Sequence, residues 1–209
     1  RLPLAELGKQ LITRLEALLK AYPDTPLRIL AHSMGGLVVR AAFADKPALW
    51  DAIVARPEGR LVMLGTPNFG SHLFVDTLLG QSDTIRLLAR IDLRHSLQEV
   101  LDIVAGFPGA LHLLPAPGFV DTGSPATPNY YDAATWRTLA ESNNDFWFGK
   151  RLGGLPTDAL LKQAAEFWQS VADTRWVKKA PDRIAYVFGK SDNTPCGIIT
   201  QQSGGIVLR

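Results

Sequence analysis

The sequence predicts a mixed α/β fold in which a parallel-sheet core carries a mostly helical insertion. Helical and strand patterns alternate over residues 1–71, an order that is typical of a parallel sheet with crossover helices. The rhythm breaks over residues 72–180, where helical patches and Pro- and Gly-rich stretches replace the strand patterns. We therefore expect a core over 1–71, a helical cap or lid over 72–180, and a return to a core strand and a hairpin over 181–209.

The composition narrows the class of protein. The chain has 209 residues, of which 46% are hydrophobic and 20% charged, and this suits a globular domain with a sizeable core. The 22 Lys and Arg against 20 Asp and Glu leave a net charge of +2, too small to argue for nucleic acid or an anionic membrane as a partner. The single cysteine, Cys196, cannot form an internal disulfide, and no Cys/His cluster has metal-ligand spacing. We therefore expect no metal and no cofactor.

The first elements follow from apolar spacing. Residues 4–20 carry leucines at steps of three and four after Pro3, which predicts an amphipathic helix. Residues 27–31 form a short apolar run that is typical of a buried parallel strand. A tightly apolar helix is expected from residue 35 to about residue 45, followed by a second buried strand over 60–65.

The later elements are a helix around residues 160–171, a strand over 184–189 and a hairpin over 197–209. Four of the five tryptophans lie in the predicted cap, where they are more often core than ligand-binding. The uncharged stretch 103–120 contains three prolines and three glycines, so it is not expected to span a membrane as a helix. No signal segment is visible, and the cysteine usage favours a reducing compartment such as the cytoplasm. Because the chain does not begin with Met, the compartment stays open.

The sharpest motif is the run AHSMGG over residues 31–36, between a predicted strand and a predicted helix. It matches the G-x-S-x-G pattern of a nucleophilic serine on a strained strand-to-helix turn, with Ala31 in place of the first glycine. Small residues at Ala31 and Gly35 would prevent clashes across such a turn, and the Met34 N–H would face a developing oxyanion. The alternative is an ordinary serine, Ser33, in a Gly-rich turn.

Two motifs carry a family resemblance. HSMGGLVVR over residues 32–40, followed after one helix and strand by GTPNFGS over 65–71, resembles lipases and acyl-hydrolases of the α/β-hydrolase superfamily. The similarity is to the group that contains lecithin–cholesterol acyltransferase-like and PGAP-type lipases. Weaker similarities to that group occur in FPGALHLLP over residues 107–115 and in the segment 187–195. The resemblance implies a three-layer αβα core, of which this chain would be a fragment.

The resemblance also implies roles for individual residues. Ser33 would be the nucleophile of a serine esterase or lipase, and His32, Thr66, Pro67 and Asn68 would line the substrate pocket. The implied substrate is an acyl ester or a lipid, with transient contact to a lipid surface through the cap. Nucleic acid is not implied as a partner.

A serine hydrolase of this fold completes a catalytic triad with an acid and a histidine base. Asp192 occupies a generic acid position after the strand that follows the cap, but it is also typical of a turn. The family pattern instead places the acid after a hairpin, which would put it beyond Arg209. A triad histidine should follow the acid in this fold, and no histidine follows Asp192. We therefore expect the remainder of the parent polypeptide, before Arg1 and after Arg209, to complete the catalytic set.

The four histidines each have a plainer interpretation than that of a base. His32 adjoins the nucleophile, His72 opens the cap, His95 fits a solvated helix position, and His112 lies in an apolar segment. The absence of a clear base leaves a second hypothesis, a catalytically inactive interaction module with this fold. A third hypothesis is an acyltransferase or thioesterase that uses the same Ser33.

Overall fold

The computed structural model describes residues 2–119, 128–143, 153–191, 194–200 and 206–208. It is a mixed α/β structure, as the alternating patterns predict. The chain divides into two compact units. We call Leu2–Asn68 with Glu166–Lys190 the sheet unit, and Phe69–Ala165 with Ser191–Arg209 the helical unit. How far residues 72–180 act as a cap stays a prediction.

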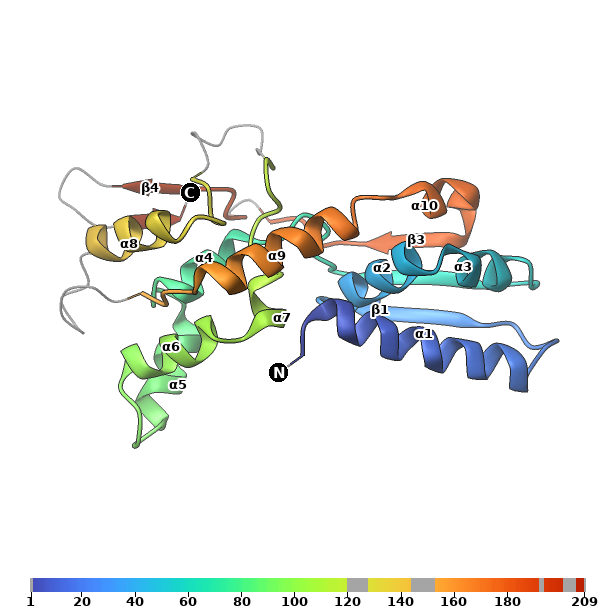
Figure 1. Cartoon of the computed structure of the whole chain (residues 1–209), viewed down its shortest axis with the longest axis horizontal. Coiled ribbons are helices and arrows are strands. Elements are labelled where there is room, and N and C mark those ends of the chain that lie inside the picture. Colours follow the sequence, from blue (N-terminus) through green and yellow to red (C-terminus); the bar gives the residue numbers. More distant parts are fainter. Residues whose placement is uncertain (1, 120–127, 144–152, 192–193, 201–205, 209) are drawn as a thin grey trace. The chain divides into compact units, whose positions relative to one another are not determined.

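The sheet unit contains one small parallel sheet. Its strands β1 (Arg28–His32), β2 (Arg60–Leu64) and β3 (Ile184–Val187) lie in the order β1-β2-β3, and both pairings are parallel (Figure 1). The predicted strands at 27–31, 60–65 and 184–189 are therefore confirmed, and residues far apart in the chain become neighbours. The helices of this unit are α1 (Leu4–Ala21), α2 (Gly35–Asp45), α3 (Pro47–Val54), α10 (Arg175–Lys179), the last turn of α9 (Asp158–Ser170) and a 3-10 turn (Pro181–Arg183).

One face of this sheet packs against helices. Successive strand residues point to opposite faces, so Ile29 and Ala31 share a face with their β2 partners Leu61 and Met63. These side chains join one core with residues of α1, α2, α3 and α10. An aromatic cluster closes that core, in which Phe43, Trp50 and Trp176 pack at centroid distances of 5.1 to 5.7 Å.

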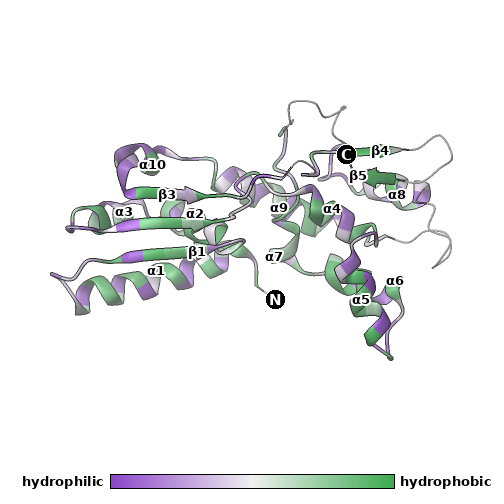
Figure 2. Cartoon of the chain, turned by 180° about the vertical axis from the view of Figure 1, so that it is seen from behind, coloured by the Kyte–Doolittle hydropathy of each residue, from purple (hydrophilic) through white to green (hydrophobic). Residues whose placement is uncertain are grey.

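The opposite face of the sheet is not covered by described residues. Leu30 points to this face and is 69% exposed, and Val187 is more than half exposed. Figure 2 shows the three strands in front of α2 and α3, which lie behind them. The described part of the sheet unit therefore forms two layers. The third layer of the expected αβα arrangement is not among these residues, because all the helices of the unit that contribute to its core lie on the face of Ile29 and Ala31.

The helical unit has its own core. Val75, Leu78, Leu111, Trp136 and Leu161 are among its buried residues. Two short strands, β4 (Ile198–Thr200) and β5 (Ile206–Leu208), pair antiparallel, as a hairpin over 197–209 requires, and Ile206 is buried in the same core. The elements of this unit are α4 (His72–Leu78), α5 (Asp83–Ile91), α6 (Leu97–Ala105), α7 (Pro108–Leu111), α8 (Ala133–Ser142), the start of α9, β4 (Ile198–Thr200) and β5 (Ile206–Leu208).

Within the described residues, no helix combines the length and the apolar character that crossing a bilayer requires. The described tryptophans are core residues: Trp50, Trp136, Trp168 and Trp176 are all buried. The fifth, Trp147, lies outside the described residues.

Candidate active site

Ser33 occupies a strained backbone position between β1 and α2. β1 ends at His32, α2 begins at Gly35, and Met34 between them already has helical φ and ψ. The φ angle of Ser33 is 52°, and among the described non-glycine residues only Glu58 shares a positive φ. Left-handed backbone is costly for a residue with a Cβ and concentrates at functional sites. The Ser33 N–H donates to the carbonyl oxygen of Leu64 at 2.8 Å, which ties the turn to the end of β2.

The turn at Ser33 leads directly into the first turn of α2. The N–H of Gly36 donates to the Ser33 carbonyl at 3.1 Å, and the N–H of Leu37 donates to the Met34 carbonyl at 3.0 Å. No side-chain hydrogen bond caps this end of the helix. The leading N–H groups of a helix have no intrahelical acceptor and carry the positive end of its dipole. Met34 and Gly35 hold these positions directly after Ser33, so an oxyanion formed beside the serine would meet donors there.

The close packing at this turn involves Gly36 rather than Gly35. A Cβ atom built on Gly35 would meet no heavy atom within 4 Å, whereas one built on Gly36 would overlap the side chain of Thr66. The predicted steric requirement for a small residue at Ala31 and Gly35 is therefore wrong for Gly35. The physical reason is tertiary: the loop after β2 lies against the second residue of α2, and this contact leaves no trace in the local pattern.

The loop after β2 is held on both sides by hydrogen bonds. Gly65, at a φ of 56°, donates its N–H to the Val187 carbonyl at 2.8 Å. The hydroxyl of Tyr186 donates to the Thr66 carbonyl at 2.5 Å, and the Asn68 N–H donates to the same oxygen at 2.9 Å. These bonds place the loop at the carboxyl ends of β2 and β3, the edge of a parallel sheet where ligands bind.

The expected pocket residues differ in exposure. The side chain of Thr66 is 1% exposed, and its hydroxyl has no hydrogen-bond partner among the described residues. Pro67 and Asn68 are half-buried and His32 is exposed. Thr66 therefore packs against α2 in this structure, and the pocket role of all four residues stays a prediction.

Arg40 is a residue of this region to which the sequence argument assigned no role. Its guanidinium donates to the carbonyl oxygen of Asn68 and, at 2.9 Å, to the carbonyl oxygen of Val171. It also lies 5.8 Å from the ring centroid of Trp168. Burial lowers the pKa of this guanidinium below its ordinary value. One side chain of α2 thus joins the loop after β2 to the end of α9, and the available sequence signal was a single charge inside an apolar helix.

The histidines are divided between the two units. His32 is the only histidine of the sheet unit, and it is exposed. His72 and His112 are buried in the helical unit, and burial lowers the pKa of His112 to about 4. The expectation that His112 is packed is therefore confirmed.

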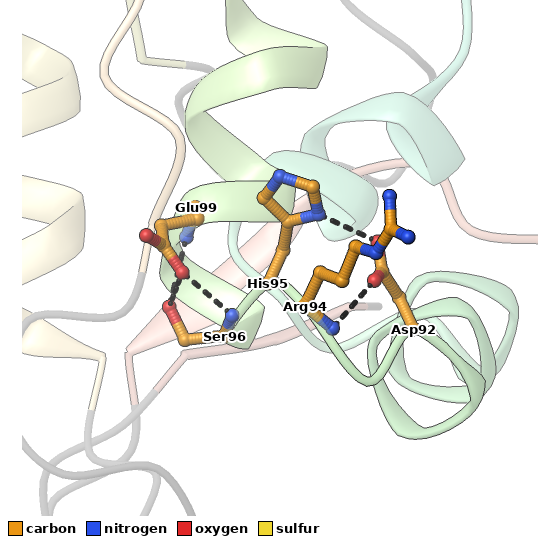
Figure 3. Close-up of polar contacts among 5 residues, drawn as sticks. All are labelled: Asp92, Arg94, His95, Ser96 and Glu99. Carbon is orange, nitrogen blue, oxygen red and sulfur yellow. Dashed lines mark hydrogen bonds and ion pairs between the residues drawn. The ribbon is translucent and has the colours of Figure 1, made fainter.

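His95 lies in the turn between α5 and α6 and pairs with a carboxylate (Figure 3). Its Nδ1 is 2.8 Å from Asp92 Oδ2, and the Arg94 N–H donates to Asp92 Oδ1 at 2.9 Å. The hydrogen bond from the Arg94 N–H is the larger cause, and the hydrogen bond with His95 the second, of the lowered pKa of Asp92. His95 is solvated as expected, but it does not lie in a helix, because the first turn of α6 starts only after Ser96.

Ser96 follows His95 in the sequence, but its side chain pairs with Glu99 rather than with Asp92 or His95. The Ser96 hydroxyl is 2.8 Å from Glu99 Oε2, and the same carboxylate accepts the Ser96 N–H at 2.7 Å (Figure 3). This is a capping box that starts α6. The Asp92–His95 pair and the Ser96–Glu99 pair therefore shape the turn, and they are two separate pairs rather than one triad. Asp192, the expected acid, lies outside the described residues.

Comparison with known proteins does not assign a family. No protein-family model and no curated protein matches the chain. Among solved structures, a chain from the crystal structure of the Tle4–Tli4 complex aligns at 22% sequence identity and a TM-score of 0.45. The alignment covers 77% of this chain and 37% of that chain, so this chain spans little more than a third of its length.

Proposed function

We propose that this chain carries the nucleophile of a serine hydrolase that cleaves carboxylic esters. The observation that supports the proposal most directly is the left-handed φ of Ser33 between a parallel strand and the first turn of a helix. A structural serine has no need of this costly conformation, whereas a nucleophile gains exposure at the sheet edge and helix N–H donors beside it. The proposal includes the α/β-hydrolase fold and the likeness to lipases of the acyltransferase-like group.

In the proposed reaction, Ser33 Oγ attacks the ester carbonyl carbon while a base removes the hydroxyl proton. The carbonyl oxygen becomes an oxyanion and accepts a hydrogen bond from the Met34 N–H. The C–O bond to the alcohol then breaks, the base returns the proton to the leaving alcohol, and an acyl-enzyme remains. The same base then takes a proton from a water molecule, whose oxygen attacks the acyl carbon. The bond from that carbon to Ser33 Oγ breaks, the base returns the proton to Oγ, and the carboxylic acid is released.

The base must come from outside the sheet unit or be His32. No other histidine belongs to this unit. His32 is the last residue of β1 and directly precedes Ser33 in the sequence. We propose that a histidine and an acid from another part of the full-length protein complete the set. The same geometry serves an acyltransferase, in which an alcohol replaces water, or a thioesterase.

A second candidate function is an inactive interaction module. The lack of any histidine besides His32 in the sheet unit favours it, because a serine without a base keeps its proton and loses about 10²- to 10⁴-fold in rate. Such a module would keep the turn as an inherited feature of the fold.

A fluorophosphonate probe on the full-length protein separates the two functions. Stoichiometric labelling that Ser33→Ala abolishes and Ser82→Ala retains supports the hydrolase. Ser82 is a matched control because it also precedes a helix, α5, and makes no side-chain capping bond there. An unlabelled but folded protein supports the module. Product analysis with an added alcohol then distinguishes hydrolysis from acyl transfer.

A further inference from the structure

Helix α5 has one packed face and one exposed apolar face. Ile85 is buried against Leu97 and Leu101, and this contact packs α5 onto α6. With 3.6 residues per turn, Leu87, Leu88 and Ile91 form a separate stripe. Their side chains are 57%, 47% and 67% exposed.

The stripe continues past the end of the helix. Leu93, in the turn between α5 and α6, is 96% exposed, so almost its whole side chain faces solvent. Single exposed leucines are ordinary, but four large exposed aliphatic side chains lie here within seven residues, and clusters of exposed apolar side chains mark interaction sites. We call Leu87, Leu88, Ile91 and Leu93 the α5 patch.

Two arginines lie beside the α5 patch. Arg90 and Arg94 are exposed, and their guanidinium groups have no carboxylate partner among the described residues. Three acids lie nearby. Asp92 is engaged by His95 and by the Arg94 N–H, Glu99 is engaged by Ser96, and Asp83 lies in the first turn of α5. The patch is therefore flanked by two available cations.

This combination fits an anionic lipid surface better than a second copy of the chain. Pairing two α5 patches about a twofold axis would bring the arginines of both copies together, with few free acids to oppose them. A lipid surface accepts both features, since aliphatic side chains enter the acyl boundary while arginines meet phosphate groups.

We propose that the α5 patch docks the protein on an anionic lipid surface, with Leu87, Leu88, Ile91 and Leu93 inserted and Arg90 and Arg94 at the head groups. This role is independent of the chemistry at Ser33. It also differs from lipid contact through tryptophans, because the described tryptophans are buried.

Vesicle co-sedimentation tests the proposal with the full-length protein. We expect binding to vesicles of phosphatidylcholine with phosphatidylglycerol and much weaker binding to phosphatidylcholine alone. Replacing each of Arg90 and Arg94 by Gln should weaken binding by about fivefold. The triple variant Leu87→Ser, Ile91→Ser, Leu93→Ser should weaken it by more than roughly tenfold. Leu155→Ser and Arg137→Gln, at exposed positions outside the patch, should bind normally, and so should Ser33→Ala.

A fluorophore tests insertion without relying on a disruptive variant. We first replace Cys196, the only cysteine of the 209 residues, and any cysteine elsewhere in the full-length protein by serine. In this background a polarity-sensitive dye on Leu93→Cys should shift to shorter wavelength with anionic vesicles. The same dye on Leu155→Cys should not shift. Equal binding to both vesicle types, unchanged binding by the triple variant, or a Leu93→Cys signal that follows protein concentration without vesicles would each overturn the proposal, the last by indicating a second copy.

Discussion

The backbone of Gly36 lies so close to the side chain of Thr66 that no methyl group fits between them. This contact joins the first turn of α2 to the loop after β2, directly beside Ser33. Gly35, one residue earlier, has open space at the corresponding position. Substitution of the two adjacent glycines by alanine should therefore have different effects on the stability of the protein.

We expect Gly36→Ala to lower the free energy of unfolding by about 1–3 kcal/mol, because the added Cβ overpacks against Thr66. Gly35→Ala should be neutral or stabilising by up to about 1 kcal/mol, because alanine favours helix and meets no neighbour. Urea unfolding of both variants provides the measurement. Equal stabilities for the two would show that Thr66 moves aside freely.

The strained backbone of Ser33 should lower the stability of the protein. Both Ser33→Gly and Ser33→Ala are expected to lose fluorophosphonate labelling, but Ser33→Gly should be more stable than Ser33→Ala by about 1 kcal/mol, because glycine adopts positive φ without strain. At Ser82, where φ is −60°, the same pair of substitutions should not favour glycine. A Ser33→Ala protein at least as stable as Ser33→Gly would contradict a strained serine.

Arg40 should be irreplaceable by lysine. A single ammonium group cannot donate to both Asn68 and Val171 with the geometry of a guanidinium, so Arg40→Lys should cost about 1–3 kcal/mol in unfolding free energy. The exposed Arg137 offers a control, and Arg137→Lys should change stability by less than about 0.5 kcal/mol. Thermal and urea unfolding both report the difference. A tolerated Arg40→Lys would mean that these two carbonyl contacts contribute little.

His112 should make the protein sensitive to acid. Its pKa is about 4 in the folded state and near 6.5 in the unfolded chain, so the unfolded state binds more protons between these values. Neutral His112 therefore contributes about 3 kcal/mol to the free energy of unfolding above pH 6.5. This contribution is lost as the pH falls toward 4.

We therefore expect His112→Leu to flatten the pH dependence of the unfolding free energy between pH 7 and pH 4.5, relative to the unsubstituted protein. His95→Gln, at an exposed position, is the matched control and should leave most of that slope in place. An unchanged slope in His112→Leu would place the acid sensitivity elsewhere.

The sequence alone determined the elements around Ser33, because their signals are local. Apolar runs of strand length at 27–31 and 60–65, an apolar helix after Gly35 and a serine between strand and helix all depend on residues within one or two turns. The packed state of His112 was predictable for the same reason, since its segment is apolar on both sides.

Other features depend on contacts between residues that are far apart in the sequence, and only the tertiary structure showed them. Gly36 rather than Gly35 is tight because Thr66 arrives from the next strand, and Arg40 finds its acceptors at Asn68 and Val171. The net charge of +2 did not predict the α5 patch, because a sum over 209 residues does not contain the positions of the arginines relative to the exposed leucines. Periodicity shows that a helix has an apolar stripe, but only the packing of α5 on α6 through Ile85 showed that a second stripe was left facing solvent.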